Sequence, residues 1–131
     1  MAYLLDTNTV SDLVRRPQGV VAERIRVVGE SEVATSIIVA AELRFGAAKK
    51  GSERLTSQLE AVLRVLEVLP FETPGDRVYG DIRARLEREG RPIGAHDLLI
   101  AAQAISGGFT LVTDDREFDR LPELATENWL R

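Results

Sequence analysis

The sequence predicts an α/β fold in which a mainly parallel sheet is covered by helices on both faces. Short apolar segments alternate with longer segments of helical periodicity along the whole chain. The short segments are almost continuously apolar, as strands buried on both faces are. Such alternation is typical of a sheet built from β-α-β units, and no linker or repeat divides the chain. We therefore expect a single domain over residues 1–131.

The first half of the chain is expected to hold two strands and four helices. The first strand ends abruptly at Asp6, and the helix after it stops at Pro17. Ser36 is a suitable N-cap for the third helix, and Lys49 and Lys50 at its end suit the negative end of the helix dipole. The expected elements are strands at 3–5 and 33–35, and helices over 9–16, 20–28, 37–50 and 53–66.

The second half repeats the alternation. One helix is nearly all apolar and is therefore expected to be buried, and Gly107 and Gly108 end it. The last strand is expected at an edge of the sheet. The expected elements are strands at 67–71, 109–113 and 126–129, helices over 76–89 and 95–106, and a short helix over 117–121.

Composition excludes several classes of protein. There is no cysteine and a single histidine, which excludes disulfide frameworks, zinc-thiolate sites and His-rich metal sites. No apolar run is long enough to cross a bilayer, and residues 1–6 lack the basic start of a signal peptide. The net charge of −4 argues against a broad basic surface for nucleic acid. We expect a soluble, cytoplasmic protein without membrane contact.

Several acids stand at positions where such a fold would bring them together. Asp6 follows the first strand, and Asp114 and Asp115 follow the strand at 109–113. Glu42 lies in an apolar turn of a helix, and Asp97 lies at the start of the apolar helix. Each has a structural explanation, as a helix cap, a turn residue or a solvated side chain. Ligands of open α/β sheets, however, bind outside the carboxyl ends of the strands.

If the first and fourth strands are adjacent, these acids share one crevice. Carboxylates at such distances repel one another and cannot all stay ionised without a cation. Oxygen ligands favour a hard divalent ion, Mg²⁺ first and Mn²⁺ as the alternative. Such ions activate water and stabilise charge on a phosphoryl group. The acids therefore predict metal-assisted hydrolysis of a phosphodiester.

Four further segments run in order and span essentially the whole chain. They are Leu4-Leu5-Asp6-Thr7-Asn8, residues 36–46 around Glu42, residues 92–102 around Asp97, and Leu111-Val112-Thr113-Asp114-Asp115-Arg116-Glu117-Phe118, followed by Glu127-Asn128-Trp129 near the end. Together these segments resemble the PIN-domain ribonucleases, and more narrowly the VapC toxins of type II toxin–antitoxin modules.

The resemblance implies a three-layer α/β/α fold with a five-stranded sheet and Mg²⁺-dependent cleavage of RNA. It implies a homodimer, a VapB-type antitoxin as partner, and contact with DNA only through that antitoxin. By motif match, Asp6 and Asp97 are the principal metal ligands, Glu42 is the third acid and Asp115 the fourth, with Asp114 as its substitute. The resemblance also implies that Thr7 and Asn8 orient Asp6 by hydrogen bonds.

Two other functions stay open from the sequence. The chain could be a non-catalytic binding module in a DNA-binding repressor complex, although a scaffold would not need the full set of acids. It could also be a phosphatase with Asp6 as nucleophile, although a second aspartate would be expected where Asn8 stands. We also consider His96 as a general base, and a surface or capping role is favoured for it. Contact with RNA is considered for Arg44 and for the arginines at 83, 85, 88 and 91, but a solvated helix surface is favoured for them. Trp129 is expected to pack, not to stack on a base.

Overall fold

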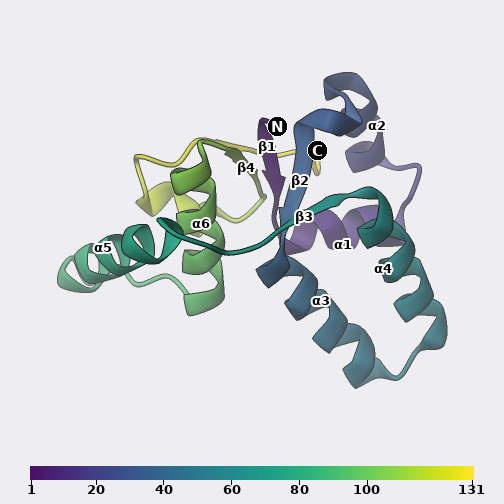
Figure 1. Ribbon diagram of the computed structural model, residues 1–131, viewed down its shortest axis with the longest axis horizontal. Coiled ribbons are helices and arrows are strands. Elements are labelled where there is room, and N and C mark those ends of the chain that lie inside the picture. The colour runs from purple at the N-terminus through teal and green to yellow at the C-terminus, as the bar shows by residue number, and fades with distance from the viewer.

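Five parallel strands form one sheet with the order β3-β2-β1-β4-β5 in the computed structural model, which describes all 131 residues (Figure 1). The strands are short and lie where the sequence predicts them. Their bounds are Tyr3–Leu5 for β1, Val33–Ser36 for β2, Glu67–Leu69 for β3, Thr110–Val112 for β4 and Thr126–Glu127 for β5.

Helices cover both faces of this sheet, as predicted. The helices between β1 and β3 lie on one side, and α5 and α6, which connect β3 to β4, lie on the other (Figure 1). Right-handed crossovers require this arrangement, because the chain reverses its direction across the sheet after β3. The bounds are Thr7–Arg15 for α1, Val20–Val28 for α2, Ile37–Lys50 for α3, Glu53–Val65 for α4, Gly75–Arg88 for α5 and Ala95–Gly107 for α6, with short 3-10 helices η1 at Glu30–Glu32 and η2 at Arg116–Arg120.

The core lies on both faces of the three central strands. Leu4, Leu5 and Leu111 have no exposed surface. The apolar helix α6 packs here, and Ile100, at the centre of its buried side, is also fully enclosed. Burial of this continuous apolar surface is the main source of the stability that holds the strand ends in register. None of the helices has the length and apolar character that crossing a bilayer requires.

Several element boundaries differ from the prediction by one or two residues, and two of these differences, at α1 and β5, have an identifiable cause. Helix α1 begins at Thr7 instead of residue 9, because the Asp6 carboxylate accepts a hydrogen bond from the Thr9 N–H at 3.0 Å and caps the helix. Strand β5 has two residues instead of four. After it, the Asn128 side chain accepts the N–H of Leu130 at 2.8 Å, and this local turn replaces further pairing.

Candidate metal centre

The carboxyl ends of β1 and β4 lie side by side at the point where the strand order reverses. Leu5 pairs with Val112, so the residues that follow each strand emerge at the same edge of the sheet. Asp6 follows β1, and Asp114 and Asp115 follow β4 with one intervening residue. The condition on which the acids would share one crevice, that these two strands are adjacent, is therefore met. A crevice at this switch point is where open α/β sheets bind their ligands.

Asp6 is a buried acid that caps α1 and also lies at the end of β1, where the candidate site is. One oxygen accepts the Thr9 N–H at 3.0 Å and caps α1, and the nearby Thr113 hydroxyl favours the charged form of the carboxylate. The Thr9 hydroxyl itself donates to the Val112 carbonyl at 3.1 Å. Burial nevertheless raises the pKa of Asp6 above its usual value, because desolvation outweighs these contacts of the carboxylate. Asp6 is therefore a helix cap, as its position after the first strand allowed. Its role as a cap does not prevent the same carboxylate from contributing to a metal site.

The expectation that Thr7 and Asn8 orient Asp6 by hydrogen bonds is not met. The Asn8 amide donates to Asp114 Oδ1 at 3.3 Å, and the buried hydroxyl of Thr7 has no hydrogen-bond partner. The orienting groups are Thr9 and Thr113. The reason is the early start of α1, which places Thr7 and Asn8 in the first turn of the helix and leaves the capping position to Asp6.

Three carboxylates form a compact group beside Asp6. Asp97, Asp115 and Glu117 each present an oxygen, and these oxygens all lie within 4.8 Å of one another. Asp97 comes from the first turn of α6, Asp115 is the N-cap of η2, and Glu117 lies in the first turn of η2. Asp115 is fixed by its own backbone, since its N–H donates to Thr113 Oγ1 at 3.0 Å and its Oδ1 accepts the Glu117 N–H at 2.9 Å.

Asp97 is the most strongly perturbed acid of the chain. Its pKa is raised to about 6, first by burial and then by the negative charges of Asp115, Glu42, Asp6 and Glu117. A raised carboxylate pKa with several like-charge neighbours is the electrostatic signature of a cation or active site. The charges of Asp6, Glu42 and Asp115 thus all reach Asp97, although Asp6 and Glu42 lie outside the compact group.

Glu42 faces the same region from the second turn of α3. Its Oε2 lies 3.9 Å from His96 Nδ1, and its buried Oε1 has no hydrogen-bond partner. An unpaired buried carboxylate oxygen is costly unless a cation binds it. His96 is largely exposed, with 69% of its side chain accessible, which agrees with the surface role favoured for it.

Glu117 is the acid that sequence reasoning missed as a candidate. It was placed only in a short helix, and its exposed position gives no burial signal in the sequence. The available signal was the Asp115-x-Glu117 spacing at the start of that helix. Asp114, the predicted substitute for Asp115, is exposed, contacts Asn8, and acts on Asp6 through its charge.

The donor set fits a hard divalent cation. It consists of carboxylate oxygens, with no sulfur and with one exposed imidazole nearby, which favours Mg²⁺ or Mn²⁺ over softer ions. The unpaired Glu42 oxygen supplies the independent sign that a positive partner belongs here. Asp97, Asp115 and Glu117 could hold the ion, with Asp6 and Glu42 flanking them.

Several cations weighed as RNA contacts have other partners. Arg44 pairs with Glu60 of α4 through two hydrogen bonds of 2.9 Å, and Arg85 pairs with Glu123 at 2.7 and 2.8 Å. Trp129 is buried, as expected. Its ring lies 5.1 Å from that of Tyr3, and its Nε1 donates to Glu127 at 3.0 Å.

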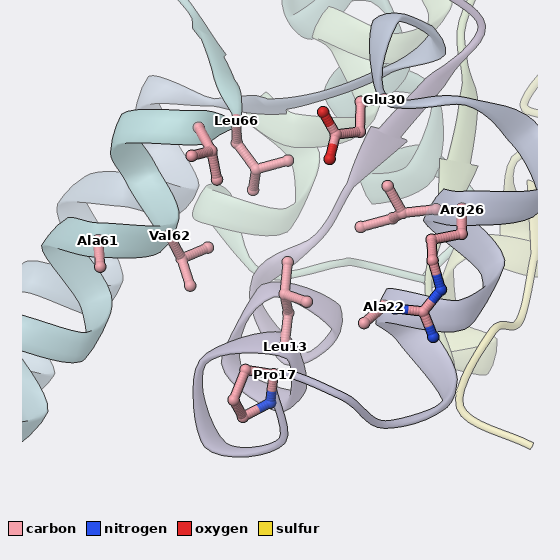
Figure 2. A pocket seen from close by; sticks show the side chains of 10 residues that line it. Leu13, Pro17, Ala22, Arg26, Glu30, Ala61, Val62 and Leu66 are labelled. Atoms are coloured by element: carbon pink, nitrogen blue, oxygen red, sulfur yellow. The ribbon is translucent and has the colours of Figure 1, made fainter.

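A separate apolar hollow lies away from these acids. It has a volume of about 310 Å³ and lies between α1, α2 and α4, with Leu13, Ala22, Val62 and Leu66 among its lining residues (Figure 2). Only Arg26 and Glu30 bring charge to it, and Figure 2 shows both beside apolar side chains. It has no cluster of titratable groups, so the crevice at the strand ends is the candidate site.

Comparison with known proteins agrees with the geometry. The PIN-domain family model matches residues 3–124. The chain is 39% identical over 132 residues to ribonuclease VapC2 of Rickettsia felis, and 36% identical over 131 residues to the tRNA(fMet)-specific endonuclease VapC of Salmonella typhimurium, with 98% of both chains covered in each case.

Solved structures give the same result. The crystal structure of VapBC2 from Rickettsia felis bound to a promoter DNA fragment matches with a TM-score of 0.90 and 36% identity, covering 98% of this chain and 99% of that one. The DNA-bound VapBC structure from Salmonella typhimurium matches with a TM-score of 0.88 and 35% identity, covering 98% of each chain. The chain therefore belongs to the PIN-domain family, and within it to the VapC ribonucleases.

Proposed function

We propose that this chain is a divalent-metal-dependent endoribonuclease and the toxin of a VapBC module, with residues 1–131 acting as one PIN domain. The observation that carries the proposal is the group of three carboxylates, Asp97, Asp115 and Glu117, within 4.8 Å of one another at the sheet's switch point. The names of its relatives, which are ribonucleases and endonucleases, support the same reaction class.

In this proposal, the acids hold the cation and set the position of the RNA phosphate. Asp97, Asp115 and Glu117 provide the ligand oxygens, and Asp6 and Glu42 complete the negative field around them. Mg²⁺, or Mn²⁺ as the alternative, supplies activated water and charge stabilisation for phosphodiester hydrolysis when it is bound. The Thr9 N–H holds the Asp6 carboxylate at the start of α1, and the Thr113 hydroxyl beside it favours its charged form.

Partners follow from the relatives by analogy. The similar solved structures are VapBC complexes, two of them with DNA, so we propose a VapB-type antitoxin as partner and DNA contact only through it. A homodimer and a cytoplasmic location complete the proposal. The tRNA(fMet) in the name of one relative is a suitable first substrate to try.

The non-catalytic binding module is the rival function. A scaffold has no use for a half-buried acid whose pKa is raised by the charges of four neighbouring acids, as that of Asp97 is, and this observation favours the enzyme. The phosphatase alternative has no support among the relatives, which cut RNA by name.

The test is cleavage of purified tRNA by the antitoxin-free chain. We expect cleavage with Mg²⁺, none with EDTA, and none with Asp97→Asn, which removes one charge and keeps the shape. The exposed Asp119→Asn, on η2 outside the cluster, is the matched control and should cleave at the wild-type rate. Metal-independent cleavage, or full activity of Asp97→Asn, would refute the proposal.

A further inference from the structure

A second hollow leads away from the acidic cluster, between α1, α3 and α4. It has a volume of about 200 Å³, and Glu42 lines it. Glu42 also acts on Asp97 through its charge, so this residue links the hollow to the acidic cluster. The hollow is therefore a groove that adjoins the candidate site, unlike the apolar hollow of Figure 2, which has none of the site acids among its lining residues.

Two cations without ion-pair partners line this groove. Arg15 lies in the last turn of α1 and Lys50 in the last turn of α3, and both are exposed. Neither has a carboxylate oxygen within 4.0 Å, whereas the ion-paired arginines of the chain are Arg16, Arg24, Arg26, Arg44, Arg83, Arg85 and Arg120. Glu42 is the only acid in the lining, so the far part of the groove is positive in a chain of net charge −4.

Gly46 lines the groove and has no side chain to project into it. Glu42, Gly46 and Lys50 are spaced four residues apart on α3 and so lie along one face of the helix, over about 12 Å at 1.5 Å per residue. Glycine is a poor helix former, and packing does not require it here, because a Cβ at Gly46 would have no atom within 4 Å. Glycine at such a position permits close approach of a ligand to the backbone.

We propose that this groove binds the RNA backbone on one side of the scissile phosphate, with Arg15 and Lys50 contacting a neighbouring phosphate and Gly46 admitting the chain. The inference rests on the proposed nuclease function and adds the path of its substrate. Arginine and lysine are the usual phosphate contacts of nucleic-acid-binding proteins, and such contacts position the polymer without reading its sequence. The buried floor, which includes Val14 and Leu59, brings no competing charge.

The test compares two double variants of equal charge. Arg15→Ala with Lys50→Ala removes the groove cations. Lys49→Ala with Arg54→Ala removes two exposed cations that lie outside it; Lys49 stands 6.0 Å from the Phe45 ring. With Mg²⁺ and a short single-stranded RNA, the groove variant should raise KM about tenfold at nearly unchanged kcat, since charge-assisted contacts are lost. The control should keep the wild-type KM.

A binding measurement separates this inference from the nuclease function. In Asp97→Asn protein, which is expected not to cleave, the slope of log K against log salt should fall by about 1.4 for two lost phosphate contacts on a single strand, and only in the groove variant. Gly46→Leu should weaken RNA binding while its thermal unfolding stays close to that of Gly46→Ala.

Each outcome has a distinct meaning. Equal KM and equal salt slopes in the two double variants would overturn the groove assignment while leaving the nuclease intact. Absence of cleavage by the wild type, with RNA binding still dependent on Arg15 and Lys50, would overturn the nuclease and retain the groove. Loss of binding to an acidic peptide with RNA binding unchanged would assign the groove to a protein partner and overturn the inference.

Discussion

The hydroxyl of Thr113 lies beside the carboxylate of Asp6 and favours its charged form, and so links the residue after β4 to the residue after β1. The same oxygen accepts the N–H of Asp115 at 3.0 Å, so it also fixes the loop that leads to η2. Thr113 is 5% exposed, which shields these contacts from water. One buried hydroxyl thus sets the relative position of Asp6 and the compact carboxylate group.

Thr113→Val should lower RNA cleavage by about 10–100-fold, the usual effect of losing a hydrogen-bond partner of a metal ligand. Valine keeps the size and the β-branched shape, so the loss reports the hydroxyl. The measurement is single-turnover cleavage with Mg²⁺. Thr126→Val, on the exposed start of β5, is the control and should match the wild type. Wild-type cleavage by Thr113→Val would show that Asp6 needs no such support.

A set of isosteric variants identifies the fourth acid. Asp115→Asn and Glu117→Gln should each reduce cleavage strongly, because both oxygens lie within 4.8 Å of Asp97. Asp114→Asn should have a smaller effect, since Asp114 is exposed and hydrogen-bonds Asn8. Asparagine at 115 still accepts the Glu117 N–H, so η2 should persist. Cleavage rates under identical Mg²⁺ rank the three; a larger loss for Asp114→Asn would reverse the assignment.

The metal-free protein should lose stability as pH rises from about 4 to about 6. The Asp97 pKa is raised from 3.8 to about 6 in the folded chain, so the folded state holds this proton more tightly than the unfolded state. Protonation of Asp97 therefore stabilises the folded state, and this contribution to the free energy of unfolding is lost as Asp97 ionises toward the upper end of the window. Asp97→Asn should remove the effect.

Thermal unfolding in EDTA measures this difference. Wild type and Asp97→Asn should have similar stability near the lower end of the window and diverge above it, with the variant more stable. Other carboxylates titrate in both proteins, so the comparison isolates Asp97. An equal pH dependence of the two proteins would contradict the electrostatic description of the site.

Mg²⁺ should stabilise the wild type above this window. A ligand at about 100 times its Kd stabilises the folded state by about 2.7 kcal/mol. The same addition should leave Asp97→Asn nearly unchanged, and Asp119→Asn should respond as the wild type does. Thermal unfolding with Mg²⁺, against sodium chloride of matched ionic strength, measures the effect. A shift of equal size in Asp97→Asn would place the ion elsewhere.

Local patterns in the sequence were enough for most of the fold. Helix α3 has the predicted bounds, because Ser36 caps its start and Gly51, in the left-handed conformation, ends it. Asp6, Glu42 and Asp97 could be identified as candidate metal ligands from the sequence, because burying a carboxylate among apolar residues costs free energy unless a partner or a cation offsets it. Boundaries failed where one side chain changed the local hydrogen bonds, as Asp6 does at α1.

What the sequence alone determined is the alternation of strands and helices and the set of acids, because hydrophobic periodicity and the cost of burying charge are local properties. Only the tertiary structure decided that Thr9 and Thr113, and not Thr7 and Asn8, hold Asp6, and that Glu117 joins Asp97 and Asp115. These relationships depend on how β1, β4, α6 and η2 meet in space, over separations of up to about a hundred residues. Long-range packing fixes them, and no short pattern encodes it.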